Sequence, residues 1–157
     1  MAKKKVKVKS GQLIDLLVIL LGIAAVCMMF LVCVKFNGSY FGLKSEIVGT
    51  EIIFGGEESV FGFSFMAMLP YLLAAIGVVL VALNLFGVLD LEIVAFAAFV
   101  VAAVFFFLAP QFVVIADSNA DKIIRLAGTF SLGTGSILAG VFAAVSGLAI
   151  LAKKFVK

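Results

Sequence analysis

The chain has 157 residues, of which 65% are hydrophobic and only 13% carry a charge. A soluble domain has roughly 45–50% apolar and about 25% charged residues, so this composition excludes an ordinary water-soluble fold. The net charge of +3 comes from lysines that gather mainly at the two chain ends. This placement indicates membrane topology, and we expect no nucleic-acid partner.

The first predicted element is a membrane-spanning helix over about residues 13–34. Five lysines precede this apolar run. The run is longer than the roughly 7–15 residues of a signal-peptide core, and no small-x-small cleavage site ends it. At 1.5 Å per residue it is long enough to cross a hydrocarbon core of about 30 Å. We therefore expect a retained helix.

The outer loop that follows, residues 35–64, carries signals of β-structure. Residues 46–54 and 59–64 are rich in β-branched and aromatic side chains, and Gly-Gly and Glu-Glu pairs lie between them. This pattern predicts a β-hairpin over about residues 46–64. A lone hairpin is marginally stable in water. We expect it to lie on the helix ends or to gain a third strand from around residues 40–43.

Two further spans are predicted at about 65–86 and 91–109, joined by a tight link. Ser64 is a candidate cap for the first of them, Gly87 suits the left-handed position that ends a helix, and Asp90 can cap the next helix. So short a link requires an antiparallel helix pair.

A second outer loop, residues 110–128, and a last span over about 129–152 complete the chain. Ser118 or Asn119 can cap a short amphipathic helix within this loop. Lys153 and Lys154 follow the last apolar run, and we interpret them as its end.

Lysine and arginine counts beside the spans predict the orientation. Five lysines precede the first span and three follow the last, whereas the two loops on the other side carry three lysines and one arginine. The sequence thus predicts a single all-α membrane domain: a four-transmembrane-helix bundle in the plasma membrane with both termini cytoplasmic and a small extracellular β-hairpin or sheet from the first outer loop.

A β-bearing loop between the first two spans and a shorter loop between the last two resemble the topology of claudins. The claudin signature needs tryptophans and a disulfide in the first outer loop, and this chain has no tryptophan and only Cys27 and Cys33, both in the first apolar run. The resemblance therefore implies topology and no claudin activity. Strings at 51–55 (EIIFG), 63–66 (FSFM) and 70–73 (PYLL), the phenylalanine run before Pro110 and a glycine-rich last span resemble uncharacterised small four-span membrane proteins of Gram-positive bacteria.

The last predicted span carries small residues at helical spacing. Such residues allow close approach of helix backbones where lipid supplies no hydrophobic driving force. Packing inside the same bundle, contact with a second copy or partner, and a glycine-lined pore are the three alternatives. The candidate helix-packing and interaction residues are Gly133, Ser136, Gly140, Ala143, Ala144 and Gly147.

Ionisable residues near the ends of the spans receive a structural interpretation. Asp15 lies just inside the first apolar run, where we expect it to stabilise the first helical turn and to pair with lysines such as Lys9. Asp90 and Glu92 receive the same interpretation. The chain has no histidine, and the sequence predicts no metal site, no cofactor and no catalytic residues.

The predicted function is that of a structural or interaction protein, which assembles with itself or with a partner membrane protein. The alternative is a small oligomeric channel or permeation subunit. The first hypothesis depends on the small residues of the last span, whereas the second requires several copies around a pore.

Overall fold

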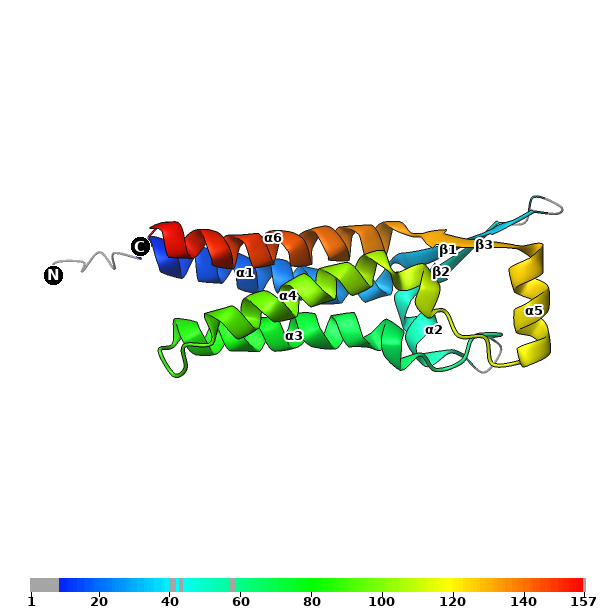
Figure 1. The fold of residues 1–157 in the computed structure, drawn as a ribbon, viewed down its shortest axis with the longest axis horizontal. Helices are drawn as coiled ribbons and strands as arrows, with labels where there is room; N and C mark the ends of the chain where they lie inside the picture. Colours follow the sequence, from blue (N-terminus) through cyan, green and yellow to red (C-terminus); the bar gives the residue numbers. More distant parts are fainter. Residues whose placement is uncertain (1–8, 40–41, 43, 57–58, 157) are drawn as a thin grey trace, which may run out of the picture.

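The computed structural model describes residues 9–39, 42, 44–56 and 59–156. Four long helices form an antiparallel bundle: α1 (Ser10–Cys27), α3 (Phe65–Leu85), α4 (Glu92–Phe107) and α6 (Thr134–Val156) (Figure 1). Helix α6 packs against α1 and α4, and α3 packs against the same two helices. We call the end where α1 begins and α6 ends the terminal end, and the opposite end the sheet end.

Three of the four bundle helices are long and apolar enough to cross a membrane. They are α1 with its 3-10 extension η1 (Met28–Phe30), α3 and α6. Helix α4 is a shorter apolar helix of 16 residues. The described chain is mostly helical, as the long apolar runs predict.

The centre of the bundle is filled by the ring of Phe99, which is fully buried. Gly22 of α1 and Gly77 of α3 lie against this ring. A Cβ atom on Gly77 would lie 2.8 Å from the ring atom Cε2 of Phe99, and one on Gly22 would lie 3.1 Å from Cζ. Protein interiors are close-packed, so the two glycines provide the space that the ring occupies.

A three-stranded antiparallel sheet lies at the sheet end, with the strand order β2-β1-β3. Its strands are β1 (Val32–Gly38), β2 (Lys44–Val48) and β3 (Gly128–Leu132). In register, Val34 of β1 lies opposite Ile47 on one side and Leu132 on the other. Strand β1 follows α1 and β3 precedes α6, so the sheet continues the α1–α6 pair and draws strands from both loops.

Two short helices complete the sheet end: α2 (Gly49–Phe54) and α5 (Ser118–Ala127), which lies across that end in Figure 1. A 3-10 turn, η2 (Ala109–Phe112), follows α4. The two loops are also joined by backbone hydrogen bonds, in which the N–H of Gly62 donates to Val114 O at 2.9 Å and that of Ala116 to Val60 O at 2.9 Å. The two loops therefore form one unit.

The structure corrects the predicted hairpin over residues 46–64. Residues Gly49–Phe54 form a helix, and β2 pairs with β1 instead. Ile52 and Ile53 are both buried, which a helix resting on α3 permits and a strand with alternating faces does not. Of the residues suggested for a third strand, 40, 41 and 43 lie outside the described residues, and the third strand is β3.

Two predicted spans differ from the helices at their sheet-side ends. The run 13–34 is α-helical only to Cys27, and the run 129–152 begins with strand β3 and continues as a helix to Val156. The other two predicted spans differ from α3 and α4 by one or two residues. Hydropathy does not separate a buried strand from a helix, since both are apolar.

The predicted turn and cap residues fall into two groups. Gly87 has a positive φ of 71°, and the Ser64 hydroxyl caps α3 by accepting from the N–H of Ala67 at 3.2 Å, so both predictions are confirmed. The N-cap residue of α4 is Leu91 rather than Asp90, and Asp117 caps α5 in place of Ser118 or Asn119. The predicted amphipathic helix in the second loop is present as α5.

Candidate functional site: a buried ion-pair network

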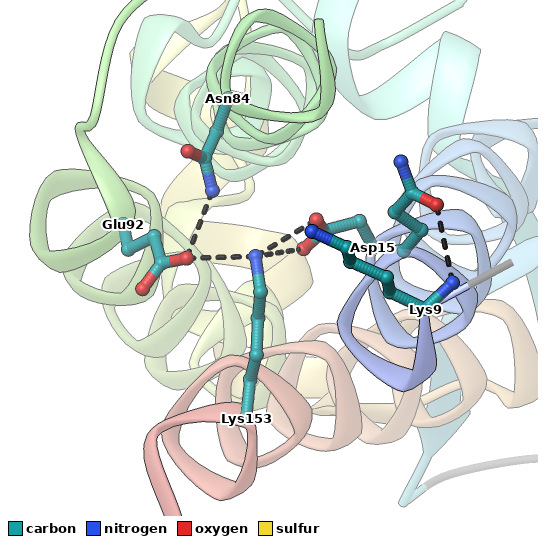
Figure 2. A network of polar contacts seen from close by, with 6 residues as sticks. Lys9, Asp15, Asn84, Glu92 and Lys153 are labelled. Carbon is teal, nitrogen blue, oxygen red and sulfur yellow. Dashed lines mark hydrogen bonds and ion pairs between the residues drawn. The ribbon is translucent and has the colours of Figure 1, made fainter. Parts of the chain in front are cut away.

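Three charged side chains meet inside the bundle at the terminal end. The Nζ atom of Lys153 on α6 lies 2.8 Å from both carboxylate oxygens of Asp15 on α1 and 2.7 Å from Oε1 of Glu92 on α4 (Figure 2). An ammonium group has three donors, and each finds a carboxylate oxygen here. The lysine is fully paired by two different helices.

The fourth helix joins the same network through an amide. Nδ2 of Asn84 on α3 donates to Oε1 of Glu92 at 2.9 Å. The side chains of Lys153, Asp15 and Glu92 are only 7%, 6% and 10% exposed. Hydrogen bonds at this depth are electrostatically stronger than in water, so the network ties all four helices together at the terminal end.

The helical phase explains why Lys153 lies inside. The buried residues of α6 recur every three or four positions, through Ala143, Ser146, Gly147 and Ile150 to Lys153. This is the spacing of one helix face. The neighbouring Lys154 falls on an adjacent face and is exposed. The buried face of α1 in turn holds Asp15, Val18, Gly22 and Ala25.

An open cavity of about 430 Å³ adjoins the network. It lies among the first turn of α1, the end of α3 and the end of α6. Its lining combines charged, polar and apolar side chains: Lys9, Ser10, Gly11, Gln12, Asp15, Asn84, Leu85, Lys153 and Val156. The cavity is large enough to accept a group of several atoms beside the ion pairs.

A second buried polar group lies where the bundle meets the sheet. The Cys33 thiol of β1 lies 3.2 Å from the Tyr71 hydroxyl of α3. Burial raises the pKa of the Cys33 thiol above its usual range, although its hydrogen-bond partners oppose the shift. The thiol is therefore protonated at neutral pH, which makes it a packing group and a poor nucleophile.

The predicted small residues of the last span lie mostly against neighbouring parts of the same chain. A Cβ atom on Gly140 would meet the Phe107 ring of α4 at 2.9 Å, and one on Gly147 would lie 3.4 Å from Val100. Gly133 donates its N–H to Cys33 O at 2.8 Å. Ser136 and Ala143 are buried and Ala144 is partly buried. These residues provide close contacts of α6 with α4 and β1.

The interpretation of Asp15 is wrong in both its position and its partner, because no acidic residue lies in the first turn of α1. Its carboxylate pairs with Lys153 rather than Lys9, and it does so in the bundle interior. Glu92 is the first residue of α4 and therefore lies in its first turn, as expected. Its side chain also forms an ion pair with Lys153. A lysine after an apolar run is typical of a membrane boundary, which predicts Lys153 at the end of the last span; the structure places it in the bundle interior instead.

Within the described part of the chain, no group of three or more histidine, cysteine, aspartate or glutamate side chains is placed to hold a metal ion. The network contains two of these side chains, and its cation is the lysine. The chain matches no protein-family model, no curated protein and no solved structure.

Proposed function

We propose that this chain crosses one bilayer four times and serves as a structural or interaction protein of the plasma membrane. Large apolar side chains are exposed on all four bundle helices, among them Leu20, Ile76, Val101 and Leu148. A surface of this kind is unfavourable in water, and it is the normal surface of a protein in lipid.

Helix α4 can serve as the fourth span despite its length. Its 16 residues give about 24 Å at 1.5 Å per residue. Leu108 and the 3-10 turn η2 continue the apolar path, and a short span is accommodated by local bilayer thinning. The helix lies between α3 and α6, so it shares their depth. Lysine counts favour cytoplasmic termini.

The observation that carries the functional proposal is that the bundle is fastened at both ends. The ion-pair network joins all four helices at the terminal end, and the sheet joins both outer loops at the other end. Such a frame holds the outer loops in a fixed arrangement. A fixed surface binds a partner with a smaller loss of conformational entropy than a mobile one.

Helix α5 is the contact surface that this frame presents. Its Ile123 is 66% exposed and its Leu126 is 80% exposed, beside the charged Lys122 and Arg125. The small residues of α6 pack mostly within the chain, so the proposal assigns contact with a second copy or a partner protein to the outer surface. The proposed four spans with a β-bearing first outer loop resemble the claudin topology in outline.

The test is the native mass of the protein after mild extraction from its own membranes. We expect a defined complex of several copies or of this chain with another membrane protein. Replacement of Leu126 by glutamate should dissociate the complex, whereas Lys154→Gln, an exposed change at the opposite end of the bundle, should leave it intact. A monomer without associated protein would contradict the proposal.

The alternative of a channel subunit is favoured by one observation, the open polar cavity at the terminal end. Farther along the bundle axis, the Phe99 ring packs against Gly22 and Gly77. A pore would therefore have to form between several copies. Ion or solute flux through liposomes that contain only this protein would favour the channel over the first proposal.

A further inference from the structure

We propose that the cavity at the terminal end binds the phosphate headgroup of an anionic phospholipid from the cytoplasmic leaflet. The inference rests on the proposed membrane embedding and orientation, and it does not depend on assembly with a partner. It concerns the cavity lined by Lys9, the first turn of α1 and the ends of α3 and α6.

The charge distribution along the chain favours an anionic ligand at this end. In the sequence, eight lysines and three acidic residues fall within residues 1–15, 90–92 and 153–157, whereas four basic and six acidic residues fall within residues 35–58 and 117–125. The two sets of segments thus carry opposite net charge. Clusters of four to eight basic residues beside a membrane span are typical of binding to anionic lipid.

The cavity lining includes one lysine, Lys9, that the described ion pairs do not use. Both carboxylate oxygens of Asp15 accept from the Lys153 ammonium group, which Glu92 shares, so the acid that lines the cavity already has a partner. Lys9 lines the same cavity, and no ion pair of its side chain is found among the described residues. Its ammonium group is the one that we assign to the phosphate.

The remaining lining fits a phospholipid better than a soluble anion. Ser10, Gln12 and Asn84 supply polar groups, whereas Leu85 and Val156 supply apolar surface in the same cavity. A phospholipid presents a charged headgroup next to apolar chains, so it satisfies both kinds of lining. The cavity lies at the helix ends, the depth at which headgroups lie in the proposed orientation.

The experiment is lipid retention, measured by native mass spectrometry of the monomer peak. The full chain is reconstituted in nanodiscs with equal amounts of phosphatidylglycerol and phosphatidylcholine. We expect the monomer to retain phosphatidylglycerol preferentially. Lys9→Gln should lower this preference about fivefold, the effect of one lysine near an anionic surface. The matched variant Lys122→Gln, on the exposed surface of α5, should leave it unchanged.

Four outcomes would overturn the proposal. The first is equal retention of the two lipids, and the second is an equal effect of Lys9→Gln and Lys122→Gln. The third is displacement of the bound lipid by excess inorganic phosphate, which would assign the cavity to a soluble anion. Replacement of Lys3, Lys4, Lys5 and Lys7 by glutamine separates the cavity from general attraction by the chain end. If that variant alone abolishes the preference while Lys9→Gln preserves it, the cavity is not the site.

The measurement separates this proposal from the function proposed above. A chain that forms no complex still gives a monomer peak, so lipid preference can be read even when assembly fails. Conversely, a chain that assembles without lipid preference refutes only the lipid site. Failure to enter nanodiscs would refute the membrane embedding that both proposals share.

Discussion

Removal of the central cation of the network should strongly destabilise the bundle. In Lys153→Met the side chain keeps its approximate length and loses its charge. Asp15 and Glu92 then remain in the interior, with side chains 6% and 10% exposed, without the ammonium group that lies within 2.8 Å of both. Breaking a buried pair by removing one partner costs about 3–5 kcal/mol, because the charges left behind are uncompensated.

The cost should depend on the unpaired carboxylates rather than on the missing lysine. Replacing a complete buried ion pair by neutral groups of similar volume is often nearly neutral in stability. The triple variant Asp15→Asn, Glu92→Gln, Lys153→Met removes all three charges, and Asn84 can still donate to the new glutamine. We therefore expect the triple variant to recover most of the stability lost by Lys153→Met alone.

The assay is reversible unfolding by sodium dodecyl sulfate in mixed micelles, followed by circular dichroism. Lys154→Met is the matched control, because Lys154 is the next residue on α6 and its side chain is exposed. We expect the control to change the free energy of unfolding by less than about 0.5 kcal/mol. If Lys153→Met costs no more than Lys154→Met, or if the triple variant is as unstable as the single one, the reasoning is refuted.

Three further predictions concern other parts of the chain. Gly77→Val should lower the free energy of unfolding by about 1–3 kcal/mol, since its side chain would displace the ring at the bundle centre, whereas Val79→Leu, on an exposed part of α3, should have little effect in the same assay. Ser64→Ala removes a helix cap and a 2.6 Å hydrogen bond to the Phe112 carbonyl, so we expect a loss of about 2 kcal/mol, of which Ser64→Thr should restore a substantial part. In a Cys27→Ala background, Cys33 should resist maleimide at pH 8 and react after denaturation, because burial raises the pKa of its thiol; rapid labelling of the native protein would contradict its burial.

Much of the bundle could be predicted because its signals are local. Long apolar runs specify α3 and α4 to within one or two residues, and the short link between them requires an antiparallel pair. A serine before an apolar run predicts the cap of α3 at Ser64. The left-handed backbone that glycine permits predicts the end of that helix at Gly87. These features depend on residues close together in the sequence.

The sheet could not be predicted in the same way, because its strands come from distant segments. Strand β1 pairs with β2 in the first loop and with β3 almost a hundred residues farther along the chain. Residues 32–34 are apolar, and residues 129–132 include Phe130 and Leu132, so the predicted spans extend into both strands. The pairing of β1 with β2 and β3, which is a tertiary contact, shows where the helices end.

The ion-pair network, by contrast, follows from helical phase once the buried face of α6 is known. A count of lysines beyond an apolar run places Lys153 and Lys154 together at the membrane boundary. The helical phase separates them, because Ser136, Ala143 and Ile150 are buried at seven-residue spacing and Lys153 continues the same face. A lysine in phase with a buried face requires acidic partners on the facing helices. Asp15 is the acid within the first apolar run, and its spacing to Gly22 and Ala25 places it on the buried face of α1. Helical phase therefore pairs Lys153 with Asp15, 138 residues apart in the sequence. A count of charges beside the spans gives only the orientation in the membrane.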